Sequence, residues 1–564
     1  MTEFILALAA VFITAGVLLL VANQLGLPPV PTYIVAGLIA GMFINEELLV
    51  ELALWGVAFL VFVFGIRLDL DDLRGVLHDG EASAVIQLLV VAPIAFTLGY
   101  LLGDYFGFEN PFRNALYFSA AATLSSTLVG ARILEEDLRN NLVYGRLASS
   151  IHFFDDIIAI GAILVLSAEV LTDTQLVTSK IGYGVLFLLA GLLLYRHGYP
   201  WLVRAAEGGD ELILMGSISI LIAFMAAAEY VEISIVVGAF AAGLAIRGDS
   251  AESLGVRNGI ESIKDFFAAI FFVTIGALVS IPSTEVVVLA GALIFLVLVV
   301  NPVVYMLTFV FEGYDGRSAF LAGLSLNQVS ELTLVIAIQA WLLRTISDTL
   351  FEAIILAAAV TMILSTFTSR YEHTLYKTTL GRVFEGRTGY IDEHSDVKEG
   401  LTDHVVIVGF GRQGRRLVST LEELNEPYVV IENDPATWNI LVDECRNYVF
   451  GDAMAPYPME LAQVSDARLV ISTADHRPVS ESLLELDTDA DVILRADTSR
   501  EAQPLLDKGA TFVTVPGVLA SDQLVENVER VLGDEREIAL LRDEHQEYLQ
   551  MVELTDMERS TGQS

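Results

Sequence analysis

The stretch SSIHFFDDIIAIGAILVL, residues 149–166, places two adjacent carboxylates, Asp155 and Asp156, in an apolar segment of the length that crosses a bilayer. An ionised carboxylate at bilayer depth costs at least about 2–3 kcal/mol, so such residues face a water-filled cavity or a partner. The two side chains are about 100° apart around a helix and can line one cavity without facing each other. Low dielectric and mutual repulsion favour a proton on at least one of them. The pair is therefore predicted to exchange a proton for a cation.

Composition indicates a membrane domain followed by a soluble one. The chain has 564 residues, of which 54% are hydrophobic, and its mean hydropathy is +0.60. Apolar runs of membrane-spanning length recur up to about residue 370, after which the sequence becomes charged and mixed. We predict a transmembrane domain (1–370), a linker (371–400), a soluble domain (401–532) and an acidic helical tail (533–564). The first apolar segment has no basic region and no cleavage site, so it is predicted to be a retained helix.

The charge balance restricts the partners. The net charge of −39 arises from 71 acidic and 32 basic residues, and only five of the basic residues are lysine. An acidic, lysine-poor surface resembles proteins of salt-loving archaea and argues against a nucleic-acid partner. The single cysteine, Cys445, excludes a disulfide framework and a cysteine metal cluster.

Thirteen membrane-spanning segments are predicted, and the loops between them give their orientation. With the C-terminal domain in the cytoplasm, the N-terminus lies outside, and eleven basic residues fall in inside loops against three in outside loops, which fits the positive-inside rule. The predicted spans are 3–22, 28–45, 48–66, 83–103, 113–134, 143–168, 178–197, 211–229, 231–247, 264–280, 284–310, 317–342 and 347–369.

An internal repeat is visible across these spans. EFILALAAVFITAG at residue 3 is echoed by ELILMGSISILIAF at 211, AGLIAGMFI (36–44) by GAFAAGLAI (238–246), and AFLVFVFGIRL (58–68) by AAIFFVTIGAL (268–278). The offset corresponds to seven spans, an odd number, so the second copy enters the membrane inverted. Inverted repeats are typical of secondary transporters with a substrate site near the midplane.

Two spans at corresponding places in the repeats carry polar interruptions and are predicted to be discontinuous crossing helices. AATLSSTLVG (121–130) supplies Thr123, Ser125, Ser126 and Thr127, and LSLNQVSEL (324–332) supplies Ser325, Asn327, Gln328, Ser330 and Glu331. Their hydroxyl, amide and carbonyl oxygens suit K⁺ or Na⁺. The alternative is hydrogen bonding between helices.

The membrane part resembles the second family of monovalent cation:proton antiporters, which includes Kef-type K⁺ efflux systems and bacterial Na⁺/H⁺ exchangers. The matching motifs are FGIRLDL (64–70), LSST (124–127), FDD (154–156), FFVTIG (271–276) and QVSE (328–331). The resemblance implies a dimeric fold of thirteen helices, in which a fixed scaffold supports a core domain that carries the ion.

The resemblance also implies roles for individual residues. Asp156 matches the principal ion- and proton-binding aspartate, and Asp155 the variable position before it, where an acid is typical of electrogenic Na⁺/H⁺ exchangers. Gln328 and Glu331 match a Q-x-x-E pattern of Kef-like members. Many relatives place a lysine in the span that corresponds to 284–310, where this chain has Asn301 as its best-placed polar residue. His152, one turn before Asp156, either tunes its proton affinity or is a packing residue.

The soluble domain begins with a dinucleotide-binding pattern. HVVIVGF is a predicted buried strand, and it leads into Gly409, Gly411, Arg412, Gln413 and Gly414 of a G-x-G-x-x-G turn that opens a helix. The next strand, PYVVIEND, contains Glu432, 23 residues after Gly409, which suits two ribose hydroxyls. Strands at 448–453, 467–473, 491–497 and 510–516 complete a predicted six-stranded Rossmann-like unit.

This domain resembles the regulator-of-K⁺-conductance module, whose short motif after the third strand matches GDA (451–453) and so includes Asp452. The resemblance implies a dimeric, nucleotide-binding gate, here without a second lobe. The ligand is predicted to be NAD(H) or one of AMP, ADP and ATP, all of which carry free ribose hydroxyls. No motif indicates thiol gating through Cys445.

The sequence thus predicts a homodimeric secondary antiporter, not an enzyme, that exchanges H⁺ for K⁺ or Na⁺ across the bilayer. The regulatory domain and Q-x-x-E favour K⁺, and the double aspartate favours an Na⁺/H⁺ exchanger. A nucleotide-gated K⁺ channel would need a carbonyl filter such as TVGYG, which the sequence lacks. A membrane-anchored oxidoreductase would need a catalytic constellation near the nicotinamide, and none is recognisable.

Overall fold

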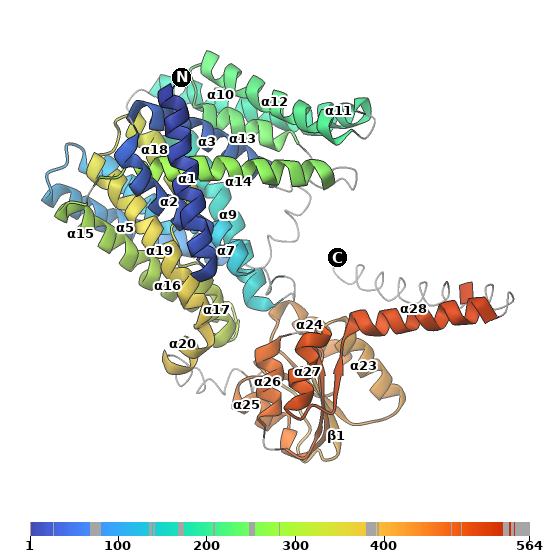
Figure 1. The fold of residues 1–564 in the computed structure, drawn as a ribbon. Coiled ribbons are helices and arrows are strands. Elements are labelled where there is room, and N and C mark those ends of the chain that lie inside the picture. The colour runs from blue at the N-terminus through green and yellow to red at the C-terminus, as the bar shows by residue number, and fades with distance from the viewer. Residues whose placement is uncertain are drawn as a thin grey trace. The chain divides into compact units, whose positions relative to one another are not determined.

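The fold is described from a computed structural model of the chain (Figure 1). It describes residues 2–25, 27–44, 46–67, 81–134, 138, 142–166, 174–206, 209–246, 254–280, 282–379, 391, 394–474, 476–486, 488–533, 541–542 and 546. The chain divides into two compact units, residues 1–384 and 385–564. Most of the predicted acidic tail lies outside the described residues.

The first unit is entirely helical in its described part. Each of the thirteen predicted spans overlaps at least one helix, and seven helices among the described residues are long and apolar enough to cross a membrane. Four shorter apolar helices, such as α2 (Pro29–Ala40), accompany them, and the count of thirteen stays a prediction.

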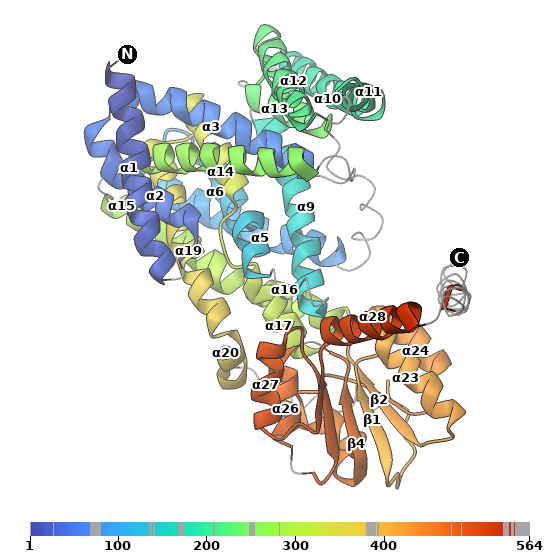
Figure 2. The ribbon, with the colours of Figure 1, turned by 45° about the vertical axis from the view of Figure 1, so that its right-hand side comes forward.

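The helices of this unit form two groups by their mutual packing (Figure 2). The first group, called the panel here, comprises α1 (Thr2–Leu25), α2, α3 (Glu46–Arg67), α12 (Asp210–Tyr230), α13 (Ile235–Leu244) and α14 (Leu254–Ala277). The second group, called the core bundle, comprises α5 (Glu81–Tyr105), α6 (Pro111–Thr123), α7 (Thr127–Ile133), α9 (Val143–Leu166), α15 (Thr284–Phe295), α16 (Asn301–Phe311), α17 (Gly316–Ser325), α18 (Glu331–Leu342) and α19 (Asp348–Arg370). Helix α10 (Thr174–Leu193) contacts α9 of the core bundle and α13 of the panel.

Packing inside the panel follows the sequence repeat. Helix α2 packs on α14, and α13, its counterpart in the second repeat, packs on α3, the counterpart of α14. Both contacts are close because they pass over glycine: a side chain at Gly37 would overlap the backbone of α14, and one at Gly243 would overlap the backbone of α3. This exchange of partners between the two copies is the arrangement expected of an inverted repeat.

A widened turn separates α15 from α16. The turn, labelled η4 (Leu296–Val300), is π-helical and lies immediately before Asn301 and Pro302. Pro302 has no N–H to donate to the preceding turn, and local π geometry is one way in which a helix accommodates that loss. The widening sets the register in which Asn301 faces the core bundle.

The second unit is a six-stranded parallel sheet in the order β3-β2-β1-β4-β5-β6, and all six predicted strands are confirmed. The strands are β1 (His404–Val408), β2 (Tyr428–Glu432), β3 (Tyr448–Phe450), β4 (Ala467–Ser472), β5 (Asp491–Arg495) and β6 (Phe512–Thr514). Alternate residues of β1 belong to hydrophobic clusters on opposite faces of the sheet. Val405 and Ile407 pack against two helices on one face, α23 (Arg412–Glu423) and α24 (Trp438–Glu444). Val406 and Val408 pack against three helices on the other face, α25 (Pro456–Leu461), α26 (Arg477–Leu484) and α27 (Ser499–Asp507). The sheet is therefore covered on both faces, as parallel sheets are.

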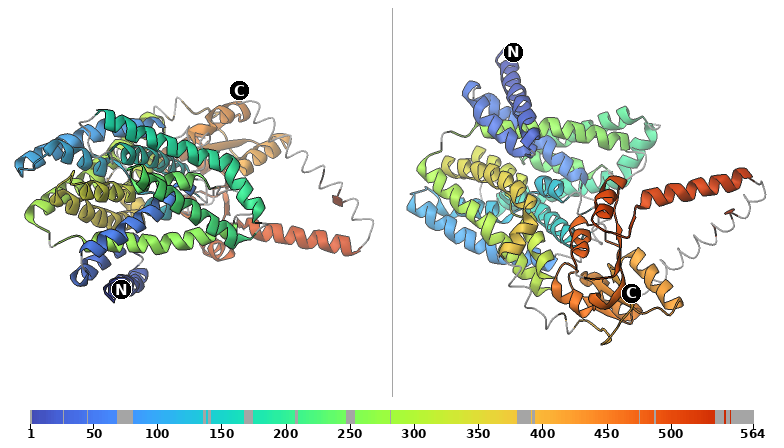
Figure 3. Two further views of the ribbon diagram at one scale, coloured as in Figure 1. Left: turned by 90° about the horizontal axis from the view of Figure 1, so that it is seen from above. Right: turned by 60° about the horizontal axis from the view of Figure 1, so that its bottom comes forward.

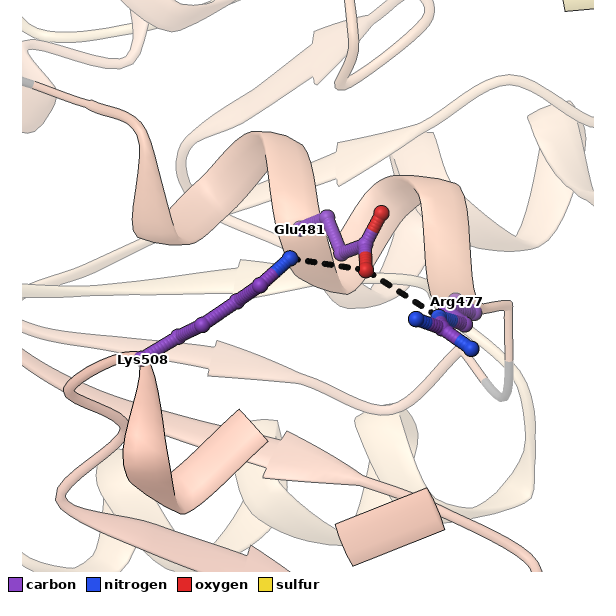
Figure 4. Close-up of polar contacts among 3 residues, drawn as sticks. All are labelled: Arg477, Glu481 and Lys508. Atoms are coloured by element: carbon purple, nitrogen blue, oxygen red, sulfur yellow. Dashed lines mark hydrogen bonds and ion pairs between the residues drawn. The ribbon is translucent and has the colours of Figure 1, made fainter. Parts of the chain in front are cut away.

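The segment predicted to be a linker (371–400) contains regular structure. Helix α20 (Glu372–Thr379) lies in the first unit, and Asp396 of the second unit forms an antiparallel bridge with Tyr448 at the β3 edge. Helix α28 (Pro516–Gly533) follows β6 and extends away from the sheet as one rod (Figure 3). Glu481 of α26 pairs with both Arg477 and Lys508 (Figure 4).

Candidate functional site

Two broken helices cross in the core bundle. Helix α6 ends at Thr123 and α7 begins at Thr127, while α17 ends at Ser325 and α18 begins at Glu331. The extended segments between them run antiparallel: Ser125 pairs with Val329, and the N–H of Ser330 donates to the carbonyl of Leu124 at 3.0 Å. The two predicted discontinuous helices are confirmed, and their breaks lie against each other.

Side chains from other helices satisfy the backbone groups that the break in α6 exposes. The amide Nδ2 of Asn301 donates to the carbonyl of Ala122 at 2.6 Å, and Nε2 of Gln87 donates to the carbonyl of Thr123 at 3.0 Å. The hydroxyl of Thr123 donates to Ser119 of its own helix at 2.9 Å. Asn301 therefore binds the C-terminal end of α6.

Glu331 and Gln328 bind the other side of the crossing. The Glu331 carboxylate accepts hydrogen bonds from the backbone N–H of Leu128, at 2.9 Å, and from the hydroxyl of Ser126. Nε2 of Gln328 donates to the carbonyls of Ser126, at 3.2 Å, and Ser325, at 3.0 Å. The Q-x-x-E pair thus links one broken helix to the other.

The two adjacent aspartates have different surroundings. Asp156 is half-buried, accepts a hydrogen bond from the Thr127 hydroxyl at 2.9 Å, and lines a cavity of about 180 Å³. Asp155 is only 3% exposed, accepts hydrogen bonds from both the N–H (2.9 Å) and the hydroxyl (2.5 Å) of Ser125, and is not among the residues that line the cavity.

The cavity lies between the panel and the core bundle. Phe64 of α3 forms its panel side, and the core bundle supplies Thr127, Ala131, Leu134, Leu138, Ser149, His152, Phe153, Asp156 and Ile160. A carboxylate and a hydroxyl at one wall of an otherwise apolar cavity can hold either a cation or a proton. The structure therefore gives Asp156, and not Asp155, direct access to this cavity.

Of the residues chosen from sequence, Asp156 alone lines this cavity, and Asp155, Ser125, Ser126, Gln328 and Glu331 lie in the hydrogen-bonded crossing around it. Thr127 and His152 also line the cavity: Thr127 was named within the polar cluster 121–130, and His152 was named with two alternative roles, but neither was assigned to the ion site from the sequence. The sequence could not identify Phe64 as a cavity residue, because an apolar residue in an apolar helix fits equally well against lipid, against the protein core or beside a cavity.

The predicted nucleotide site lies at the carboxyl edge of the sheet in the second unit. Gly409 follows β1 with φ +95°, a conformation that favours glycine, and a side chain at Gly414 would overlap the carbonyl of Gly409. A side chain at Gly411, the N-cap of α23, would meet nothing within 4 Å. The first and third glycines thus serve the fold, and the second leaves open space beside the helix N-terminus, as close approach of a pyrophosphate requires.

The acidic residues of this site lie on the two neighbouring strands. Glu432 at the end of β2 accepts hydrogen bonds from the backbone N–H groups of Phe410 (2.7 Å), Asn433 (2.7 Å) and Asp434 (2.9 Å). Burial raises the pKa of Glu432 above its usual value. Asp452, just after β3, accepts from Met454 at 3.0 Å.

The remaining residues chosen for this site, Arg412 and Gln413, are exposed at the first turn of α23. Burial also raises the pKa of Cys445 to about 12, so its thiol stays protonated at neutral pH.

Comparison with known proteins identifies both domains. The family described as "Sodium/hydrogen exchanger, transmembrane" matches residues 8–370. The chain belongs to this family. A TrkA-N domain matches residues 405–516, so the second unit is a Rossmann-like TrkA-N domain. As a member of an exchanger family, the protein is a membrane transporter and not an enzyme.

Two relatives span most of the chain. A protein of Alkalimonas amylolytica whose name describes a K⁺ efflux antiporter, KefB, is 26% identical over 88% of this chain and 76% of its own length. A protein of Escherichia coli K12 whose name describes a cation/proton antiporter, YbaL, is 24% identical over 91% and 95%. The solved structure of the sodium proton antiporter MjNhaP1 from Methanocaldococcus jannaschii, at 16% identity, covers 67% of this chain and 100% of its own with a TM-score of 0.50, which supports the membrane fold.

Proposed function

We propose that this exchanger carries a monovalent cation across the membrane in exchange for protons, with Asp156 as the group at which the two compete. The observation that carries the proposal is the position of Asp156: it is half-buried beside a broken helix, bound to Thr127, and exposed to a cavity between two helix groups. A carboxylate in a low dielectric binds a proton or a cation more readily than it stays bare, so loading one ion releases the other.

The two helix groups offer a route for alternating access. The cavity reaches Asp156 at the end of α3 that carries Phe64, whereas the opposite end of the same boundary is bridged by hydrogen bonds between Ser280 and Glu352. We propose that the core bundle moves against the panel, so that Asp156 faces each side in turn. With the orientation predicted from the loops, the present cavity faces the cytoplasm.

K⁺ is the cation that we propose first. The name of the KefB relative describes K⁺ efflux, and the Q-x-x-E pair of this chain links the crossing helices through Gln328 and Glu331. Na⁺ is the second candidate because two adjacent acids occupy α9, as is typical of sodium exchangers, and because the name of MjNhaP1 describes sodium transport.

The TrkA-N domain is proposed to bind an adenine nucleotide, NAD(H) first, and to control transport. The support is the open space at Gly411, the N-terminus of α23 and the Glu432 carboxylate, which together suit a pyrophosphate and two ribose hydroxyls. We further propose a homodimer with its N-terminus outside and this domain in the cytoplasm.

The proposal is tested in proteoliposomes that contain a trapped pH dye, with K⁺ or Na⁺ added in turn and a protonophore as a control for leakage. Cation-driven proton movement is expected in the wild type and is expected to be lost in Asp156→Asn. The matched control, Asp104→Asn at the exposed end of α5, should behave as wild type. Exchange that persists in Asp156→Asn would contradict the central assignment, and a response to K⁺ alone or Na⁺ alone would settle the cation.

A further inference from the structure

Asp155 is enclosed in a way that Asp156 is not. Its Oδ2 accepts both hydrogen bonds from Ser125, and its side chain is buried at 3% exposure, outside the set of residues that line the cavity. A proton that reaches or leaves Asp155 from the cavity therefore has to pass through another group.

His152 lies between Asp155 and the cavity. Its Nδ1 is 3.2 Å from the Ser125 hydroxyl, which in turn donates to Asp155, and its ring lines the cavity beside Asp156 and Thr127. The residue is 3% exposed, and Nε2, which is buried against Gly130 of α7, has no hydrogen-bonding partner among the described residues. The order of groups is thus cavity, imidazole, hydroxyl, carboxylate.

Gly130 of α7 fixes the ring in this place. A side chain at residue 130 would overlap Nε2 and Cε1 of His152, so the imidazole can approach α7 only because this position is glycine. Gly161 on α9 offers the matched contrast, since a side chain there would meet nothing within 4 Å.

We propose that His152 and Ser125 form a proton relay that connects the cavity to Asp155. This inference rests on the proposed antiport function and assigns a second proton path within it. An imidazole accepts a proton at one nitrogen while it releases one from the other, so it can relay protons without holding a lasting charge.

In the inward step, Nε2, which α7 covers at Gly130 in this structure, takes a proton from a cavity water that reaches it as α7 moves away from the ring. Nδ1–H passes its proton to the Ser125 oxygen, and the Ser125 hydroxyl proton moves to Oδ2 of Asp155. One proton has then moved from water to carboxylate, the imidazole has changed tautomer, and no electrons are transferred. The reverse sequence discharges Asp155.

The relay lies among a small set of ionisable groups. Those that face this part of the core bundle are Asp156 on α9, Tyr305 on α16 and Glu331 on α18 through Ser126. The other helices packed against α9 carry Arg132 at the end of α7, Arg317 at the start of α17, Asp104 at the end of α5 and Lys180 in the first two turns of α10. The relay thus delivers its proton to Asp155, whereas Asp156 exchanges protons directly with the cavity.

The division between the two aspartates has a kinetic consequence. Removing the relay should slow proton delivery without changing how the cavity binds the cation. His152→Gln keeps a hydrogen-bonding side chain but cannot relay, and we expect it to lower the maximal exchange rate at least about tenfold, at an unchanged half-saturating cation concentration. Imidazole added to His152→Ala should restore much of the rate, because the cavity can admit it.

The test uses the full chain in dye-loaded proteoliposomes over a range of pH, with Gly130→Ala and Gly161→Ala as a matched pair. Gly130→Ala should reproduce the rate defect by displacing the ring, and Gly161→Ala should not. Wild-type rates in His152→Gln would overturn the relay while the antiport function stands. A raised half-saturating cation concentration, or a His152→Ala defect that imidazole does not relieve, would show a structural role and overturn it as well. A wild type without exchange would overturn both proposals.

Discussion

Glu352 of α19 accepts two hydrogen bonds from Ser280, which follows α14: one from the hydroxyl at 2.5 Å and one from the backbone N–H at 3.3 Å. The contact joins the panel to the core bundle beside a pocket of about 310 Å³, which Leu49 of α3 also lines. Phe64, 15 residues further along α3, lines the cavity at Asp156, so the two openings are about 22 Å apart along the helix axis. The boundary between the groups is bridged at one end and open to Asp156 at the other.

The first prediction concerns motion across this boundary. A disulfide-linked cross-link between Ser280→Cys and Glu352→Cys, made with a bifunctional methanethiosulfonate reagent, should stop exchange, because it prevents the core bundle from moving against the panel. Reduction should restore the exchange rate, which is measured with the pH dye in proteoliposomes. The only native thiol, Cys445, is buried and has a raised pKa of about 12, so the reagent should react with the introduced pair.

The control pair lies wholly within the core bundle. Asn114 of α6 accepts hydrogen bonds from the N–H (3.0 Å) and hydroxyl (3.1 Å) of Ser347, the N-cap of α19. A cross-link between Asn114→Cys and Ser347→Cys should leave exchange unchanged. Equal inhibition by both cross-links would argue against relative motion of the two groups.

The second prediction concerns the crossing of the broken helices. Glu331→Ala removes the acceptor for the Leu128 N–H and for the Ser126 hydroxyl, both in a buried site, and should lower the free energy of unfolding by about 1–3 kcal/mol for each unsatisfied group. Glu331→Gln keeps one acceptor oxygen and should cost less. Thermal unfolding in detergent measures the order, and equal stability of Glu331→Ala and wild type would rule out this bridging role.

The third prediction separates folding from nucleotide binding in the glycine turn. Gly411→Ala adds a side chain in open space, so the domain should keep its stability while its affinity for NADH or an adenine nucleotide falls. Gly409→Ala instead forces a side chain into a left-handed conformation, 2.7 Å from the Thr473 hydroxyl, and should destabilise the domain. Calorimetric binding and thermal unfolding of the full chain distinguish the two, and undiminished nucleotide binding by Gly411→Ala would place the ligand elsewhere.

The fourth prediction concerns Glu481, whose pKa is lowered by the hydrogen bond from Lys508 and then by Arg477. A lowered pKa in the folded state stabilises the fold above the usual carboxyl pKa, and this contribution disappears as the pH falls through the lowered value. The three side chains are 31%, 67% and 51% exposed for Glu481, Arg477 and Lys508, so the effect of Glu481→Gln should be only about 0.5 kcal/mol.

Calorimetric unfolding of the full chain at pH 7 and pH 3, at low and high salt, checks this expectation. The destabilisation by Glu481→Gln should be present only at pH 7 and low salt. Glu485→Gln, at the C-cap of the same helix, serves as the control. A loss of stability that persists at pH 3 would indicate a packing effect instead of an ionic one.

Membrane segments and the sheet could be predicted because their signals are local. Spanning the bilayer requires long apolar runs, and each predicted span coincides with helix in the described residues. The run HVVIVGF followed by G-x-G-x-x-G predicted β1, the glycine turn and the start of α23 correctly. A continuous apolar run of this length, ended by glycines, is typical of a buried parallel strand that leads into a helix. The helix α20 was missed in a segment predicted to be a linker, since it is short and polar and its sequence has no apolar period.

The sequence by itself determined that the pair Asp155–Asp156 had to avoid lipid, that two spans were interrupted, and that a Rossmann-like domain followed. Only the tertiary structure decided which aspartate meets the cavity, because that depends on the rotation of α9 against α7, α17 and α18. It likewise decided that Asn301 binds the end of α6 and that His152 lies between the cavity and Ser125. The sequence gives the chemistry of each side chain, but the packing of helices that are distant in sequence determines which groups that side chain contacts.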